Sequence, residues 1–202
     1  MAHALNPTAT PFLPAVASLP TLPDAALTAT LDLLFEPSAD LHALALPTLR
    51  TLSFATYPDL IETLRDELLA IAESVGSDGD GDGRAPLYSI LGSHPRLGEP
   101  KKEVLSAQSA AEQRRLQEGG GEEGERLRRL NREYEARFPG LRYVVFVNGR
   151  GRGEVMEDMR RRIERGDVRE EEREAIRAMC DIAKDRAAKL QKSSSEAVEN
   201  GA

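Results

Sequence analysis

PDLIETLRDELLAIAESV, residues 58–75, is the stretch that decides the fold class of this chain. Its residues Leu60, Leu64 and Leu68 follow one another at intervals of four, and Ile71 comes three residues later. Intervals of three and four place side chains on one face of an α-helix, whereas a strand would require strict alternation. The stretch therefore predicts a long helix with one buried face.

The same periodicity recurs along most of the chain. Further helices are expected at about 24–36, 41–46, 87–91, 109–117, 122–138, 154–165 and 168–190. Leucine and alanine, both strong helix formers, dominate the composition, while aromatic residues make up only 4% and Trp is missing. Aliphatic side chains must therefore fill the core, and we predict an all-α, single-domain bundle of roughly eight helices.

One segment breaks the helical pattern. Residues 141–147 are rich in β-branched and aromatic side chains, and taken alone they predict a strand. Because the sequence offers no obvious partner strand, an extended segment that crosses a helical core is an equally good interpretation. We therefore expect an extended segment near 141–148.

The chain divides into three parts by composition. We expect an irregular proline-rich lead-in over 1–22, a helical domain over 23–191 and a disordered, serine-rich tail over 192–202. The acidic Gly/Asp stretch at 76–84 resembles the first half of a calcium-binding loop. Ser89, however, stands where such a loop needs a bidentate Glu, so we interpret the stretch as a surface loop.

Charge and hydropathy exclude several classes of function. The net charge of −7 gives no support for nucleic-acid binding. The basic run Arg160, Arg161, Arg162 and Arg165 is interleaved with acidic residues, which indicates a solvated helix face. No apolar run approaches the roughly 20 residues that span a bilayer, so no membrane association is expected. An intracellular protein is favoured, cytoplasmic or peroxisomal, with no recognisable targeting signal.

The cysteine and histidine content argues against disulfides and metals. Cys180 is the single cysteine, so no internal disulfide can form and a reducing compartment is favoured. His3, His42 and His94 have no spacing typical of zinc ligands. We therefore expect no metal site.

His94 is the first candidate for chemistry. It precedes Pro95, and the residue before a proline is pushed out of the helical conformation, so a helix should end here and fix the imidazole in a turn. Histidine titrates near neutral pH and suits proton transfer. A purely structural histidine is the alternative.

Ser109 and Glu112, followed by Gln113, form the second candidate. Ser-x-x-Glu is a capping box, in which each side chain satisfies a free backbone N–H at a helix start. The same first turn, with its free amides, also suits an anionic ligand. Both interpretations are compatible with the sequence.

Arg186 is the third candidate. It follows Met179 and Ile182 and precedes Leu190 at intervals of three and four, which places it on the apolar stripe of the last helix. A guanidinium group there needs an anionic or hydrogen-bonding partner. The partner is either a carboxylate of the chain or a bound substrate, unless the side chain reaches solvent near the helix end.

These motifs, taken in order, resemble the 2-oxo-4-hydroxy-4-carboxy-5-ureidoimidazoline (OHCU) decarboxylase family over roughly residues 20–190. The matching motifs are Leu34-Phe35-Glu36-Pro37-Ser38, His94-Pro95-Arg96-Leu97-Gly98, Ser109-Ala110-Ala111-Glu112-Gln113, Leu130-Asn131-Arg132-Glu133-Tyr134, Tyr143 to Val147, Gly149-Arg150 and Arg186. Many members carry Phe-Gly-Phe before the pocket segment. This chain departs from that pattern with Phe138-Pro139-Gly140-Leu141-Arg142-Tyr143.

The resemblance implies an all-helical enzyme of urate breakdown that decarboxylates OHCU to (S)-allantoin with neither metal nor organic cofactor. It makes His94 and Glu112 the catalytic residues. The residues implied to bind the small-molecule substrate are Pro95, Ser109, Gln113, Val144, Val145, Phe146, Val147, Asn148 and Arg186. The family also suggests a homodimer.

Two other functions are compatible with the sequence. A non-catalytic helical interaction protein would use its charged helices as a partner surface, and it would tolerate replacement of His94. A related hydrolase or lyase would act on ureido compounds with the same polar residues and a water molecule. Arg186 favours an enzyme, because an interaction helix has no reason to carry an arginine along its apolar stripe.

Overall fold

A computed structural model describes residues 12–74, 83–98 and 121–199, the side chains of 194–199 excepted. Within these ranges the regular structure is entirely helical and contains no strand, which confirms the all-α prediction. The elements are a 3-10 helix η1 (Val16–Thr21) and the α-helices α1 (Asp24–Leu34), α2 (Ala39–Thr51), α3 (Tyr57–Ser74), α4 (Ala85–Gly92), α6 (Glu122–Arg137), α7 (Arg152–Arg165) and α8 (Val168–Glu199). No helix in the described ranges is long and apolar enough to cross a membrane.

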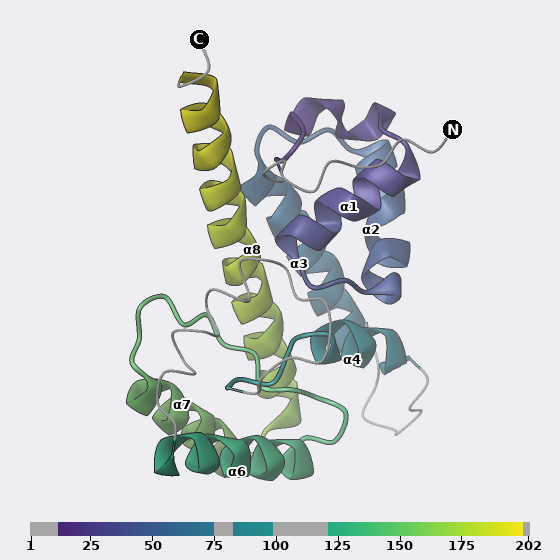
Figure 1. Cartoon of the computed structure of the whole chain (residues 1–202). Helices are drawn as coiled ribbons and strands as arrows, with labels where there is room; N and C mark the ends of the chain where they lie inside the picture. Colours follow the sequence, from purple (N-terminus) through teal and green to yellow (C-terminus); the bar gives the residue numbers. More distant parts are fainter. Residues whose placement is uncertain (1–11, 75–82, 99–120, 200–202) are drawn as a thin grey trace, which may run out of the picture.

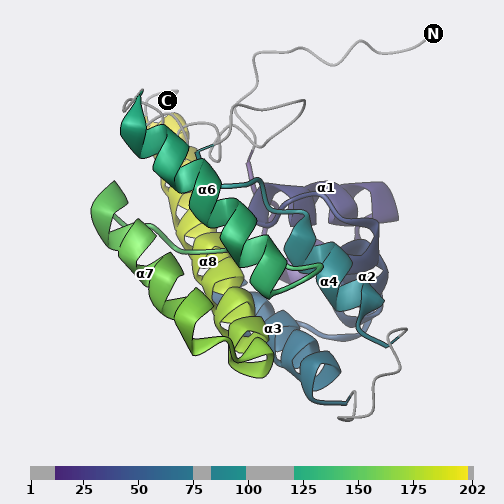
Figure 2. The same cartoon turned by 90° about the horizontal axis from the view of Figure 1, so that it is seen from below.

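Helix α8 is the axis around which the other helices are arranged (Figure 1). Helix α3 packs along it, and α1 and α4 also contact it. Helix α2 packs on α1, α4 and η1 and completes this N-terminal group. On the other side of α8, α6 and α7 lie next to each other as a pair (Figure 2).

The helix that decided the fold class forms as expected, with a small rotation of its buried face. Leu60, Leu64 and Leu68 of α3 are at most 1% exposed. Ile71 is only half-buried, whereas Ala72 beside it is buried. Helix α3 begins with a reciprocal cap between Thr56 and Asp59, in which each backbone N–H donates to the other side chain, at 2.9 and 3.2 Å.

Helix α2 is longer than the predicted segment 41–46, because it continues through Pro47 to Thr51. A proline inside a helix removes one backbone hydrogen bond, and the contacts beyond it offset that loss. Leu49 is 1% exposed in the core. Arg50 donates to the carbonyl of Pro20 at 3.1 Å and forms an ion pair with Asp24. The last turn of α2 therefore anchors the lead-in, part of which is the 3-10 helix η1.

The C-terminal end of the chain also differs from the sequence-based expectation. Helix α8 continues to Glu199, whereas its end was predicted near Leu190 and a disordered tail was predicted from residue 192. The sequence there contains no proline or glycine before Gly201, and adding residues to an existing helix is far easier than starting one. Ser193 donates its hydroxyl to the carbonyl of Lys189 at 3.0 Å within the helix. Residues 200–202 lie outside the described ranges.

Residues 141–147 form neither helix nor strand, and Asn148 lies in the turn that follows, so the strand interpretation is not borne out in the described residues. Arginine side chains meet the carbonyl groups of this segment instead. Arg162 of α7 donates to the carbonyl of Val144 at 3.0 Å, and the Arg150 guanidinium donates to the carbonyl of Phe146. Buried backbone carbonyls need donors, and here charged side chains take the place of a neighbouring strand.

Candidate functional site

His94 lies in the turn that follows α4, as the His94-Pro95 pair predicted. The imidazole is almost completely enclosed, with 5% of the residue exposed. The turn closes at Gly98, whose φ of +77° lies in the left-handed region. A Cβ at this position would come within 2.5 Å of the Leu127 side chain on α6. The histidine is therefore held in a closely packed turn rather than on a mobile loop.

Burial of His94 lowers the pKa of its imidazole to about 4. The nearby carboxylate of Glu36 raises this pKa, and the nearby guanidinium of Arg186 lowers it. The ring is consequently neutral at pH 7. Its Nε2 atom is buried and has no hydrogen-bond partner among the described residues. A buried polar atom without a partner is uncommon in native proteins, and a catalytic role is one of the reasons for such an atom.

Arg186 lies beside this histidine and has a carboxylate partner. Its Nη2 donates to Oε1 of Glu36 at 2.7 Å, and its Nη1 donates to the carbonyl of Leu34 at 3.2 Å. The side chains of Arg186 and Glu36 are each 2% exposed. Glu36 explains how the guanidinium can be buried. It is the carboxylate of the chain that one of the sequence-based alternatives required. The predicted apolar stripe is confirmed, since Met179, Ile182 and Leu190 are all buried.

The described residues combine a neutral imidazole with a charge-balanced Arg–Glu pair, which is suited to proton transfer next to an anionic group. Other chemistry has less support in the same ranges. They contain no cluster of His, Cys, Asp and Glu side chains that could hold a metal ion. Burial raises the pKa of the Cys180 thiol to about 12, so it is no nucleophile near neutral pH.

The remaining sequence-predicted residues fall into two sets. Pro95 is half-buried next to His94, and the segment 144–148 runs from buried Val144 to exposed Asn148, whose φ is 42°. Arg142, just before this segment, donates to the carbonyl of His94 at 3.1 Å, so the segment and the histidine turn are in contact. The other set, Ser109, Glu112 and Gln113, lies outside the described residues, as does most of the acidic Gly/Asp stretch.

A second buried arginine was not predicted from the sequence. Arg162 is 3% exposed, which corrects the interpretation of the run at 160–165 as a solvated face. Its Nε donates to Glu171 at 3.0 Å and pairs with Glu174 at 3.0 Å, while Tyr134 donates to Glu171. The signal was present, because Arg162 continues the buried stripe of Val155 and Met159 at intervals of four and three. The acidic neighbours along the chain concealed it.

The role of Glu36 was also missed, although its motif had been noted. It follows the end of α1 and precedes Pro37, where a carboxylate has no local reason to be buried. The sequence did offer one signal for this role, because Arg186 on its apolar stripe had no carboxylate partner assigned to it.

The chain matches the model of a known protein family. The model of the family described as OHCU decarboxylase matches residues 20–188 of the chain. No curated protein matches the chain. The match runs from the end of η1 into α8 and includes the His94 turn and Arg186. This chain therefore belongs to the OHCU decarboxylase family, whose carboxy-lyase activity serves purine breakdown.

Proposed function

We propose that the chain converts OHCU to (S)-allantoin without a metal or organic cofactor, and that His94 moves the proton. One observation carries the proposal. The imidazole of His94 is buried and neutral, its Nε2 has no partner among the described residues, and the Glu36–Arg186 pair lies next to it. A structural histidine in a closed core would be expected to use both ring nitrogens.

The substrate supplies the electron sink for this reaction. Its carboxylate and hydroxyl share one ring carbon, next to a C=N bond. When the carbon–carboxylate bond breaks, its electron pair forms a ring C=C bond, and the C=N pair moves onto nitrogen, which takes up a proton. The hydroxyl then loses its proton to give a carbonyl, and the adjacent carbon gains one. The net reaction consumes one proton and releases carbon dioxide, so the protein needs to orient the carboxylate and deliver a proton to one face.

Because the His94 ring is neutral at pH 7, its first step in proton transfer is to accept a proton. At pH 7 the neutral ring has a lone pair on one nitrogen, which can take the hydroxyl proton and return it to carbon. Delivery from one side fixes the chirality of the product. By resemblance, Glu112 shares in this proton transfer, and Ser109, Gln113, Arg186, Pro95 and the backbone of 144–148 hold the substrate.

The proposal is tested by circular dichroism of the allantoin product, with OHCU generated in situ from urate by its two upstream enzymes. Wild type is expected to form one enantiomer rapidly. His94→Asn removes the titrating ring at similar size, and we expect its rate to fall by about 10²- to 10⁴-fold.

His42→Asn is the matched control. His42 is the other histidine in the described ranges, and it pairs with Asp32 at 2.6 Å, outside the candidate site. This variant should keep the wild-type rate. If wild type gives only the slow racemic background, the decarboxylase proposal is wrong and a helical interaction protein becomes the better hypothesis. If His94→Asn matches wild type, another residue moves the proton.

A further inference from the structure

The turn that carries His94 cannot be held by helical hydrogen bonds. Helix α4 ends at Gly92, and its last turn is closed by Ser93, whose N–H and hydroxyl donate to the carbonyl of Ile90 at 3.2 and 2.7 Å. Pro95 has no N–H to donate. Contacts from other parts of the chain must therefore fix the residues after Ser93.

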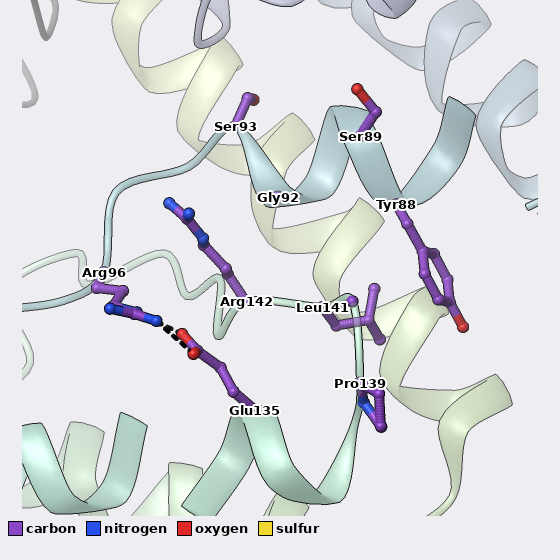
Figure 3. Close-up of a pocket in the computed structure, with 10 residues that line it drawn as sticks. Tyr88, Ser89, Gly92, Ser93, Arg96, Glu135, Pro139, Leu141 and Arg142 are labelled. Carbon is purple, nitrogen blue, oxygen red and sulfur yellow. Dashed lines mark hydrogen bonds and ion pairs between the residues drawn. The ribbon is translucent and has the colours of Figure 1, made fainter. Parts of the chain in front are cut away.

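Three side-chain contacts hold this turn. Arg142 Nη1 donates to the carbonyl of His94 at 3.1 Å. Arg96 of the turn donates through Nε and Nη2 to both carboxylate oxygens of Glu135, at 2.5 and 2.6 Å. Asn131 Nδ2 donates to the carbonyl of Leu97 at 3.0 Å. Figure 3 shows Arg142 extending from the segment after Pro139 towards the end of α4, next to the Arg96–Glu135 pair. Of these contacts, the one from Arg142 acts on the histidine itself.

We infer that Arg142 is a positioning residue, which sets the direction of the His94 imidazole by holding the His94 carbonyl. The inference rests on the proposed function of His94. The direction of this carbonyl fixes the peptide plane between His94 and Pro95, and the proline ring already restricts the backbone of the residue before it. A charged donor makes a stronger hydrogen bond than a neutral one. Together these restraints orient the bond from Cα to Cβ of His94.

The surroundings of Arg142 make this contact accessible. Its side chain lines an open groove of about 600 Å³, together with Tyr88, Ser89 and Gly92 of α4. Replacement of a side chain in an open groove leaves no sealed cavity in the core, so the fold should tolerate the change. A small solute can also reach the space that the guanidinium leaves.

The kinetic test compares wild type, Arg142→Ala and Arg142→Lys. We expect Arg142→Ala to lower kcat by roughly tenfold with KM almost unchanged, because a displaced imidazole affects the chemical step more than substrate binding. Arg142→Lys should recover part of the rate, and millimolar guanidinium should raise the rate of Arg142→Ala. Arg129→Ala is the control, since Arg129 lies on α6, is exposed and pairs with Glu133 at 3.4 Å. It should keep the wild-type rate and show no response to guanidinium.

A second readout does not depend on activity. Long-range proton–nitrogen NMR of the His94 ring is expected to show shifted resonances in Arg142→Ala and near-normal ones in Arg142→Lys and Arg129→Ala. Wild-type kcat in Arg142→Ala would overturn the inference, and so would a loss that neither lysine nor guanidinium reduces. If wild type itself has no decarboxylase activity, the proposed function fails, and the NMR comparison alone decides whether Arg142 positions the ring: unshifted resonances overturn the inference.

Discussion

Arg162 and Arg186 are both buried arginines on the apolar stripes of helices, but their surroundings differ. Arg162 is 3% exposed and lies among the carboxylates of Glu171 and Glu174, with the carbonyl of Val144 as a further acceptor. Arg186 is 2% exposed and pairs with Glu36 next to a histidine. Both guanidinium groups have anionic partners. The difference lies in the neighbouring polar groups.

Around Arg162, the nearby tyrosine hydroxyls also have hydrogen-bond partners. Tyr134 donates to Glu171, and Tyr143 donates to Asp158 at 2.6 Å. Although burial opposes the charge of Arg162, hydrogen bonds with Glu171 raise the pKa of the guanidinium, and burial raises the pKa values of both tyrosines. The guanidinium and the two tyrosine hydroxyls therefore keep one protonation state at ordinary pH. Next to Arg186, the His94 Nε2 has no such partner in the described ranges, and its ring can change protonation state. A saturated cluster stabilises the fold, whereas an unsaturated one leaves a group for chemistry.

The largest expected effect is on stability, at Arg162. Removing one partner of a buried ion pair leaves the other charge without compensation, so we expect Arg162→Ala to lower the free energy of unfolding by about 3–5 kcal/mol. Urea denaturation followed by far-ultraviolet circular dichroism measures it. The double variant Arg162→Met with Glu171→Leu should recover part of this loss, because Glu174 keeps Arg165 as a partner while the hydroxyl of Tyr134 loses its acceptor. A single variant as stable as wild type would contradict the structural role.

At Arg186 the effect should fall on the rate instead. Arg186→Lys keeps the positive charge beside Glu36 but cannot reproduce the planar guanidinium that also reaches the carbonyl of Leu34. We expect kcat/KM to fall about 100-fold, the scale of a displacement of about 1 Å in an active site. Its free energy of unfolding should change by less than about 2 kcal/mol, as for an ordinary hydrogen-bond loss. Arg162→Lys, measured in parallel, should show the opposite result, with a larger loss in the free energy of unfolding and a smaller fall in kcat/KM.

The two arginines also show what the sequence could and could not predict. The stripe of Met179, Ile182 and Leu190 placed Arg186 on the apolar face of its helix, because helical periodicity is local and can be read directly. The burial of Arg162 was missed, although the same argument applied. Alternating charges along the chain suggested a solvated face, and the partners Glu171 and Glu174 lie on the next helix.

Partners distant in sequence were the general difficulty. Glu36 and Arg186 are 150 positions apart, and Arg142 and His94 are 48 apart. No periodicity links such pairs, since tertiary packing alone brings them together. Within the described ranges the helices were predicted well, because each depends on its own apolar face and caps. The helix expected at 109–117 lies outside those ranges. The errors concentrated at helix ends, as at Pro47 and after Leu190. At these ends tertiary contacts, or the ease of extending an existing helix, outweigh the residues that would locally end it.

His94 predicts a smaller, pH-dependent change in stability. Its pKa is about 4 in the folded chain and about 6.5 when unfolded, so the unfolded state binds more protons between these values. Stability from this group is therefore complete above pH 6.5 and declines as the pH falls towards 4. At pH 5 wild type should have lost about 2 kcal/mol more than His94→Asn, relative to pH 7. Equal losses in the two proteins would mean that the folded ring protonates normally.

The smallest effect is expected for Tyr143→Phe, which tests whether the saturated cluster is separate from the site. Tyr143 donates to Asp158, which also pairs with Arg161 and Arg162, so the carboxylate keeps charged partners after the change. We expect a loss of about 1 kcal/mol in the free energy of unfolding and an unchanged kcat. Tyr88→Phe is the matched control, since its hydroxyl donates to buried Glu172 at 2.9 Å.

A tenfold fall in kcat for Tyr143→Phe, with normal activity in Tyr88→Phe, would contradict this separation. Tyr143 directly precedes Val144, whose carbonyl Arg162 holds, and the segment continues into the predicted substrate-binding residues. A rate effect at this hydroxyl would then mean that the cluster around Arg162 positions the segment for catalysis as well as stabilising the fold. The saturated arginine would in that case support the reaction through the backbone, as we infer for Arg142 at His94.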